Sequence, residues 1–150
     1  MTVPVENDVS SWTYMPWVDE YVMQNKRLTK EHYRLVYLTN LIYHLLDESN
    51  KDTAREVFIK EVVPLAKRHL RFEILVMNTI DFRHINQQHY EQHCQAHAKL
   101  EQGIDEISAK IHQTDMAEVA SFLRDWLDNH IRVEDSEYNA EIVKLGIKNG

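Results

Sequence analysis

The sequence predicts an all-α fold, an antiparallel up-and-down four-helix bundle with an extended N-terminal arm. Apolar residues recur at steps of three and four in four successive segments, which is the spacing of one face of a helix. Three glycines and three prolines in 150 residues leave little material for the turns of an all-β fold. We therefore expect residues 1–150 to form one domain, with the arm over 1–27 and the helical bundle over about 28–147.

The first two elements are the arm and the first helix. Residues 1–27 sustain no helical period, and we expect their aromatic side chains to fix the arm to the body of the domain. The first helix is expected to begin near Thr29, acting as N-cap, and to end at the polar stretch 47–51.

The second helix is expected to open with a capping box, Thr53-x-x-Glu56, in which each side chain accepts a free backbone N–H. Pro64 lies inside this helix. Because proline removes one helical hydrogen bond and clashes with the preceding turn, we expect a kink there.

The third helix is expected over about 85–111, where apolar residues and histidines share one face. The fourth opens at Asp115-x-x-Glu118, another cap-like start, and is expected to end around Val133. A short apolar tail follows, with Gly146 as its stop.

Composition narrows the function classes. Cys94 is the single cysteine, so no internal disulfide can form and the chain suits a reducing compartment. The net charge of −7 argues against nucleic acid as a partner. The sequence shows no signal peptide and no apolar run near the ~20 residues that cross a bilayer, so we expect a cytoplasmic protein without membrane insertion.

Nine histidines are the informative feature, because several lie at spacings that suit a metal site. His69 and Glu73 are four residues apart, as are His93 and His97, and residues four apart stack on one helix face. His130 and Asp135 are five apart, a swing of about 140° on an ideal helix. Asp135 can therefore join His130 only if the helix loosens or ends between them.

Imidazole suits iron, copper and zinc, and carboxylates can bridge two divalent ions. Seven such side chains are too many for one metal ion and about right for two. Burying them without metal would leave donors and acceptors unpaired, at roughly 1–3 kcal/mol each. The candidate ligands are His32, His69, Glu73, His93, His97, His130 and Asp135.

The order of these ligands and their flanking residues resembles the hemerythrin family, in particular the short single-domain bacterial hemerythrins (bacteriohemerythrins). The resemblance covers nearly the whole chain, and its most specific part is the last motif of the set. The motifs are Trp17-Val-Asp-Glu-Tyr21, Glu31-His32-x-x-Leu35, His69-Leu-Arg-Phe-Glu73, His93-Cys-Gln-Ala-His97 and Asp125-Trp-Leu-Asp-Asn-His-Ile131.

The resemblance implies a non-heme diiron centre (Fe²⁺/Fe³⁺) with an oxo or hydroxo bridge. One iron would be held by His93, His97 and His130, and the other by His32 and His69, with Glu73 and Asp135 bridging the two. It also implies reversible O₂ binding at the two-histidine iron, for transport, storage or delivery, and no enzymatic activity. The O₂ pocket would be lined by Leu35, Leu70, Trp126, Ile131 and Val133.

Departures from the family pattern leave alternatives open. His89 and His93 are also four apart and could replace His93 and His97, but apolar residues follow the latter pair at the family's offsets. His89 would then be an extra ligand or lie behind the ligands, as would Tyr138. Leu70 stands where the family usually has Phe, which favours a roomier pocket.

Two other functions compete with reversible O₂ binding. The first is a diiron redox enzyme acting on O₂, peroxide or nitric oxide. The second is a bundle that senses oxygen or iron and acts through a separate protein partner, which the sequence leaves unknown. A ferritin-like diiron oxidase is excluded, because no Glu in this chain is followed by His three residues later.

Overall fold

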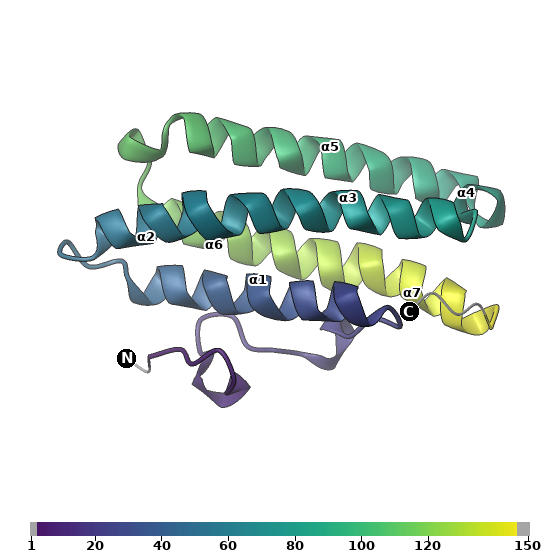
Figure 1. Cartoon of the computed structure of the whole chain (residues 1–150), viewed down its shortest axis with the longest axis horizontal. Helices are drawn as coiled ribbons and strands as arrows, with labels where there is room; N and C mark the ends of the chain where they lie inside the picture. Colours follow the sequence, from purple (N-terminus) through teal and green to yellow (C-terminus); the bar gives the residue numbers. More distant parts are fainter. Residues whose placement is uncertain (1–2, 147–150) are drawn as a thin grey trace.

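The computed structural model describes residues 3–146, and this part of the chain is helical without a strand, as the sequence predicts (Figure 1). Two π-helical segments, η3 and η5, join α2 to α3 and α6 to α7 without a break. No helix among the described residues is long and apolar enough to cross a membrane. The α-helices are α1 (Lys26–His44), α2 (Lys51–Val57), α3 (Val63–Thr79), α4 (Phe82–Ile85), α5 (Gln87–Ala109), α6 (Met116–Leu127) and α7 (Ser136–Lys144), and the π segments are η3 (Phe58–Val62) and η5 (Asp128–Asp135).

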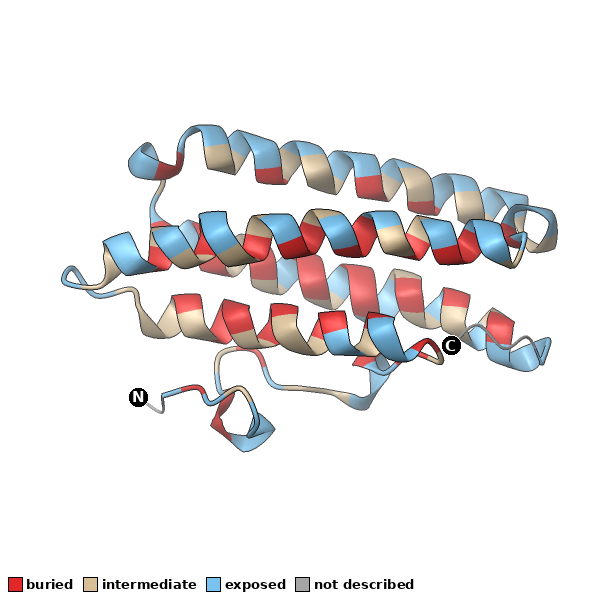
Figure 2. Ribbon diagram, in the orientation of Figure 1, coloured by how far each residue is buried: buried red, intermediate tan, exposed pale blue. Residues whose placement is uncertain are grey.

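The long helical runs lie side by side: α1, the run from α2 through α3, α5, and the run from α6 through α7 (Figure 1). Helix α1 contacts α3 and α6, and α3 also contacts α5. Buried residues gather on the sides of the runs that face one another, and exposed residues gather on the outer sides (Figure 2).

The apolar core has two parts, with polar residues between them. On α1, Leu35 belongs to the larger cluster and Leu28 to a smaller cluster near α4 and α7. His32 lies between these two leucines in the sequence and is itself fully buried. The candidate ligands therefore occupy a polar layer between two apolar clusters.

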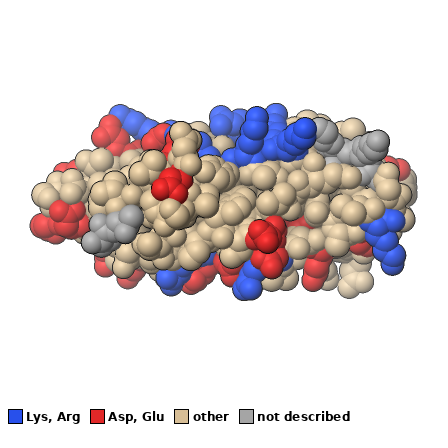
Figure 3. Space-filling view, turned by 90° about the horizontal axis from the view of Figure 1, so that it is seen from below, with Lys and Arg blue, Asp and Glu red and all other residues tan. Residues whose placement is uncertain are grey.

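Residues 3–25 precede α1 and contain two short 3-10 turns, η1 (Val9–Ser11) and η2 (Asp19–Tyr21). Trp12 packs on Tyr33 of α1, with ring centroids 4.6 Å apart. The Asn40 side chain accepts the backbone N–H groups of Tyr14 and Met15 and donates to the Met15 carbonyl. Figure 3 shows this face of the molecule, on which the middle is mostly uncharged and Lys and Arg gather along one margin.

Both predicted N-caps in the first half of the chain are wrong by a few residues. Asn25, not Thr29, caps α1, and its side chain accepts the Leu28 N–H. Thr29 lies inside the helix, where its hydroxyl accepts the Met23 N–H. Helix α2 begins at Lys51, so the predicted capping box that starts at Thr53 lies within the first turn.

The disturbance expected at Pro64 takes the form of a wide π turn. Segment η3 ends two residues before Pro64, and the proline occupies the first turn of α3. The helical run continues through the proline to Thr79.

The last run differs from the prediction in length. Asp115 caps α6 as expected, accepting the Ala117 N–H. The run does not end around Val133 but continues through η5 and α7 to Lys144. Gly146 has a φ of 70°, the left-handed conformation of a helix stop.

Candidate metal centre

The seven candidate ligands meet inside the helices, and each is at most 5% exposed. They come from α1, α3, α5 and η5, and they form two groups whose ligand atoms lie within 4.8 Å of one another. Glu73 belongs to both groups. The three-histidine quartet is Glu73, His93, His97 and His130, and the two-histidine quartet is His32, His69, Glu73 and Asp135.

Glu73 turns one carboxylate oxygen toward each quartet. Its Oε1 contacts the Nε2 atoms of His93 and His97, the latter at 2.9 Å, and lies 3.6 Å from Nε2 of His130. Its Oε2 lies 3.7 Å from Nε2 of His69, one helical turn earlier on α3. This is the geometry of a carboxylate shared between two sites.

Asp135 is the second side chain that reaches both quartets. Its Oδ2 lies 3.2 Å from Nε2 of His32 and 3.4 Å from Nε2 of His130, and its Oδ1 lies 3.2 Å from Nε2 of His93. The π segment η5 makes this possible, because an i→i+5 turn brings residues five apart nearly into line. The loosening that the spacing of His130 and Asp135 requires is therefore present.

Three of the five imidazoles have their outward nitrogen fixed by an acceptor. His32 Nδ1 donates to the Tyr21 carbonyl at 2.9 Å, and His69 Nδ1 is paired with Glu31 Oε1 at 3.0 Å. His130 Nδ1 is paired with Glu134 Oε2 at 2.9 Å. A protonated Nδ1 leaves the Nε2 lone pair facing the centre, which is how such acceptors orient metal ligands.

None of these three acceptors was predicted from the sequence. Glu31 stands in the quoted first-helix motif, but its partner His69 is 38 residues away, and no local spacing reveals that pairing. The Tyr21 acceptor is a backbone carbonyl, which no side-chain pattern can indicate. Glu134 lies four residues after His130, so ordinary helical spacing could have revealed it.

Mutual charge stabilisation outweighs burial at Glu73, His93, His130 and Asp135. Burial raises the pKa of the Glu73 carboxyl, but the imidazoles of His93 and His130 hold it well below its ordinary value. Burial lowers the pKa of His93, but Glu73 and Asp135 raise it to about 11. Burial lowers the pKa of His130, but Asp135 and Glu73 raise it above its ordinary value. Burial and Glu73 raise the pKa of Asp135, but His130 brings it below its ordinary value. At His97 burial prevails, and the pKa is lowered.

Several buried ligand atoms have no hydrogen-bond partner among the described residues. They include the Nε2 atoms of His32, His69 and His130, Glu73 Oε2 and both oxygens of Asp135. The contacts of these atoms fall within ion-pair distance without hydrogen-bond geometry. Unsatisfied buried polar atoms are costly, and one set of cations could satisfy all of them. Imidazole with carboxylate is a donor set that fits divalent transition metals.

The structure brings His93 and His97 to Glu73, and it leaves His89 outside both quartets. His89 Nδ1 lies 3.4 Å from Glu141 Oε2, and its ring stacks on His93 at 5.8 Å. Tyr138 is buried, with its ring 6.3 Å from that of His93. Both residues thus lie behind a ligand.

Four of the five predicted pocket residues are buried: Leu35, Leu70, Trp126 and Ile131. The fifth, Val133, is 44% exposed and lies on the outer side of the helix. The wider turn of η5, which carries Asp135 inward, leaves Arg132 and Val133 on the outer side.

Comparison of this chain with models of known protein families, and separately with curated proteins, finds no match. The assignment of this site therefore depends on its residues and their geometry.

Proposed function

We propose that this chain is a hemerythrin-like four-helix bundle whose buried centre holds two iron ions and binds O₂ reversibly. The observation that carries the proposal is the sharing of Glu73 by two quartets of buried ligands. One metal ion needs no second quartet, whereas two adjacent ions need a carboxylate with one oxygen for each. Asp135, in contact with histidines of both quartets, is suited to the same bridging role.

The protein residues have distinct tasks in this proposal. His93, His97 and His130 would hold one iron, and His32 and His69 the other, which has one protein ligand fewer. Two ferrous ions, when bound, supply the two electrons that O₂ takes up and returns on release.

Apolar side chains and hydrogen-bond acceptors around the ligands would support reversible O₂ binding. Leu35, Leu70 and Ile131 are at most 1% exposed and exclude water from the centre. The Tyr21 carbonyl and the carboxylates of Glu31 and Glu134 hold three imidazoles in the ligating tautomer.

The test is metal content with an optical spectrum, on protein purified without oxygen and then exposed to air. We expect about two irons per chain, as two quartets imply, with colour that appears in air and disappears under vacuum. Glu73→Gln should reduce binding of both irons, whereas His69→Gln and His97→Gln should each affect mainly one. Glu118→Gln, an exposed change on α6, is the control.

Other outcomes contradict the proposal in distinguishable ways. Iron that oxidises at once and never releases O₂ favours the redox enzyme acting on O₂, peroxide or nitric oxide. Uptake of zinc but not iron would support a metal centre and contradict reversible O₂ binding. Equal loss of both irons in His69→Gln and His97→Gln contradicts two separately held ions.

A further inference from the structure

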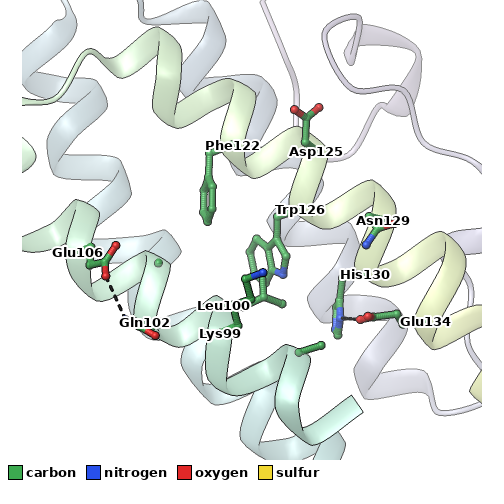
Figure 4. Close-up of a pocket in the computed structure, with 12 residues that line it drawn as sticks. Lys99, Leu100, Gln102, Glu106, Phe122, Asp125, Trp126, Asn129, His130 and Glu134 are labelled. Atoms are coloured by element: carbon green, nitrogen blue, oxygen red, sulfur yellow. Dashed lines mark hydrogen bonds and ion pairs between the residues drawn. The ribbon is translucent and has the colours of Figure 1, made fainter. Parts of the chain in front are cut away.

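A groove lies on the outer side of the three-histidine quartet, between α5 and the run of α6 and η5 (Figure 4). Its volume is about 770 Å³, within the range of small-molecule sites. We name it the α5–α6 groove. The residues that form its apolar surface and its inner end are Ala96, Leu100, Gly103, Phe122, Trp126 and His130.

One wall of the α5–α6 groove is a row of aromatic rings. Phe122 and Trp126 are nearly parallel, with centroids 6.4 Å apart and planes 20° apart. Trp126 and His130 continue the row at 6.1 Å and 25°. The Trp126 ring projects between Leu100 and His130 (Figure 4). Such a wall favours a flat, apolar occupant that can pack against ring faces.

Trp126 also has a polar group that lacks a partner. The side chain is only 6% exposed, and its indole N–H has no hydrogen-bond partner among the described residues. An indole N–H can only donate, and a buried donor without an acceptor is unfavourable. An occupant that offers an acceptor oxygen would correct this deficit.

Gly103 lets the Phe122 ring lie close to α5 in the lining of the α5–α6 groove. It lies in the interior of α5, where glycine is less favourable than alanine. A Cβ at this position would lie 3.3 Å from Cζ of Phe122, a tight contact. The glycine therefore makes room for the Phe122 ring of this wall at the expense of helix stability.

The rim of the α5–α6 groove is acidic. Glu106, Asp125 and Glu134 line it, and Lys99 is the only Lys or Arg among its lining residues. Glu134 is already paired with His130. The excess of carboxylates disfavours an anionic occupant.

We propose that the α5–α6 groove is a binding site for a neutral aromatic molecule of one or two rings that carries an acceptor oxygen. The rings pack against Phe122 and Trp126, and a small turn of the Trp126 ring toward the groove brings its N–H, which is buried in this structure, to the oxygen. The occupant lies beside His130, so it is one imidazole from the candidate metal centre. The lining of the α5–α6 groove, including the outer side of His130, is present without a metal ion, so binding there does not depend on which metal the centre holds.

The probe for this site is coumarin, a neutral two-ring molecule with a carbonyl oxygen. Calorimetric titration of the full chain, metal-free and metal-loaded, should show one coumarin per chain in both states. Coumarin-3-carboxylate, which is anionic, should bind about tenfold more weakly or worse because of the acidic rim.

The variants locate the binding. Gly103→Leu fills the groove and should abolish coumarin binding, while Ala98→Leu adds similar bulk to an exposed position of α5 and should leave it unchanged. Trp126→Phe keeps a ring but removes the donor, and should weaken binding about tenfold. If circular dichroism shows that Gly103→Leu does not fold, Ala96→Leu fills the groove from a neighbouring turn.

Three results would overturn the proposal. The first is absence of coumarin binding by the wild-type chain up to the solubility limit. The second is binding that Gly103→Leu or Ala96→Leu leaves unchanged in a folded protein. The third is tighter binding of the anionic probe than of coumarin. Iron content is measured on the same samples, so failure of the metal centre is seen separately.

Discussion

The pairing of Glu31 with His69 gives the sharpest test of how the centre is held. Glu31 Oε1 lies 3.0 Å from His69 Nδ1, and the second carboxylate oxygen lies 3.3 Å from the Arg27 guanidinium. Burial raises the pKa of the Glu31 carboxyl, but the hydrogen bonds from His69 and Arg27 keep it below its ordinary value. Glu31→Gln keeps an acceptor in nearly the same place and removes the charge.

The structure predicts which ion responds to Glu31→Gln and by how much. Loss of a carboxylate behind a ligating imidazole weakens metal binding about 10- to 100-fold, or about 1.4–2.8 kcal/mol. The loss should fall on the two-histidine quartet, because His69 belongs only to that one. In the metal-free protein we expect a cost of about 1 kcal/mol in the free energy of unfolding, since a charged hydrogen bond becomes neutral and the exposed Arg27 contributes little.

The assay is anaerobic Fe²⁺ titration against a competing chelator, with thermal unfolding of the metal-free variant alongside. The expected fall in melting temperature is about 2–4 °C for a chain of this size. Glu134→Gln is the matched variant for the other quartet, through His130, and Glu20→Gln is the exposed control. Wild-type affinity for both ions in Glu31→Gln, or equal weakening of both, would show that Glu31 does not support the two-histidine quartet through His69.

Three further predictions concern protons and packing. Because the pKa of His93 is about 11 in the metal-free protein, Zn²⁺ binding at pH 7.5 should release at least one proton per chain, seen as a calorimetric heat that varies with the ionisation enthalpy of the buffer. The pKa of His93 is raised above its ordinary 6.5, so its contribution to the free energy of unfolding is complete below pH 6.5 and is lost as the pH rises toward 11. The pKa of Glu73 is lowered, so its contribution is complete above its ordinary 4.5 and is lost in acid. Scanning calorimetry should therefore find the metal-free protein most stable between the ordinary pKa values of Glu73 and His93, 4.5 and 6.5. In the metal-loaded protein, protonation of the ligands over the same pH range weakens metal binding. A melting temperature independent of pH in both forms would contradict this prediction. Leu70→Ala should reduce the free energy of unfolding by about 2–5 kcal/mol in urea, and Leu75→Ala, at an exposed position of α3, by less than about 0.5 kcal/mol.

The interior faces of the helices could be predicted because they depend on spacing alone. His69 and Glu73 are four apart, so any regular helix through both places them on one face. The same holds for His93 and His97, and the structure places this pair with Glu73 in one quartet and His69 with Glu73 in the other. The choice of His97 over His89 also followed from spacing, through the apolar residues that continue the row.

Helix starts were harder to predict, because several residues near each start could act as caps. Asn25 and Thr29 are both good N-caps by type. The structure uses Asn25, and Thr29 instead accepts the Met23 N–H from the segment before α1. That choice depends on how residues 3–25 lie against the helix, which is a tertiary contact and leaves no mark in the local pattern.

The last helical run shows what a spacing can require without specifying its form. The five-residue interval between His130 and Asp135 requires that the helix loosen or end, and both possibilities satisfy the ligands equally. The residues beyond Asp135 decide between them. Tyr138 and Ile142 are at most 1% exposed and belong to the smaller apolar cluster, so the helix must continue to bury them. A π segment is the solution that aligns His130 with Asp135 and keeps the helix intact, and it leaves Val133 exposed as a consequence.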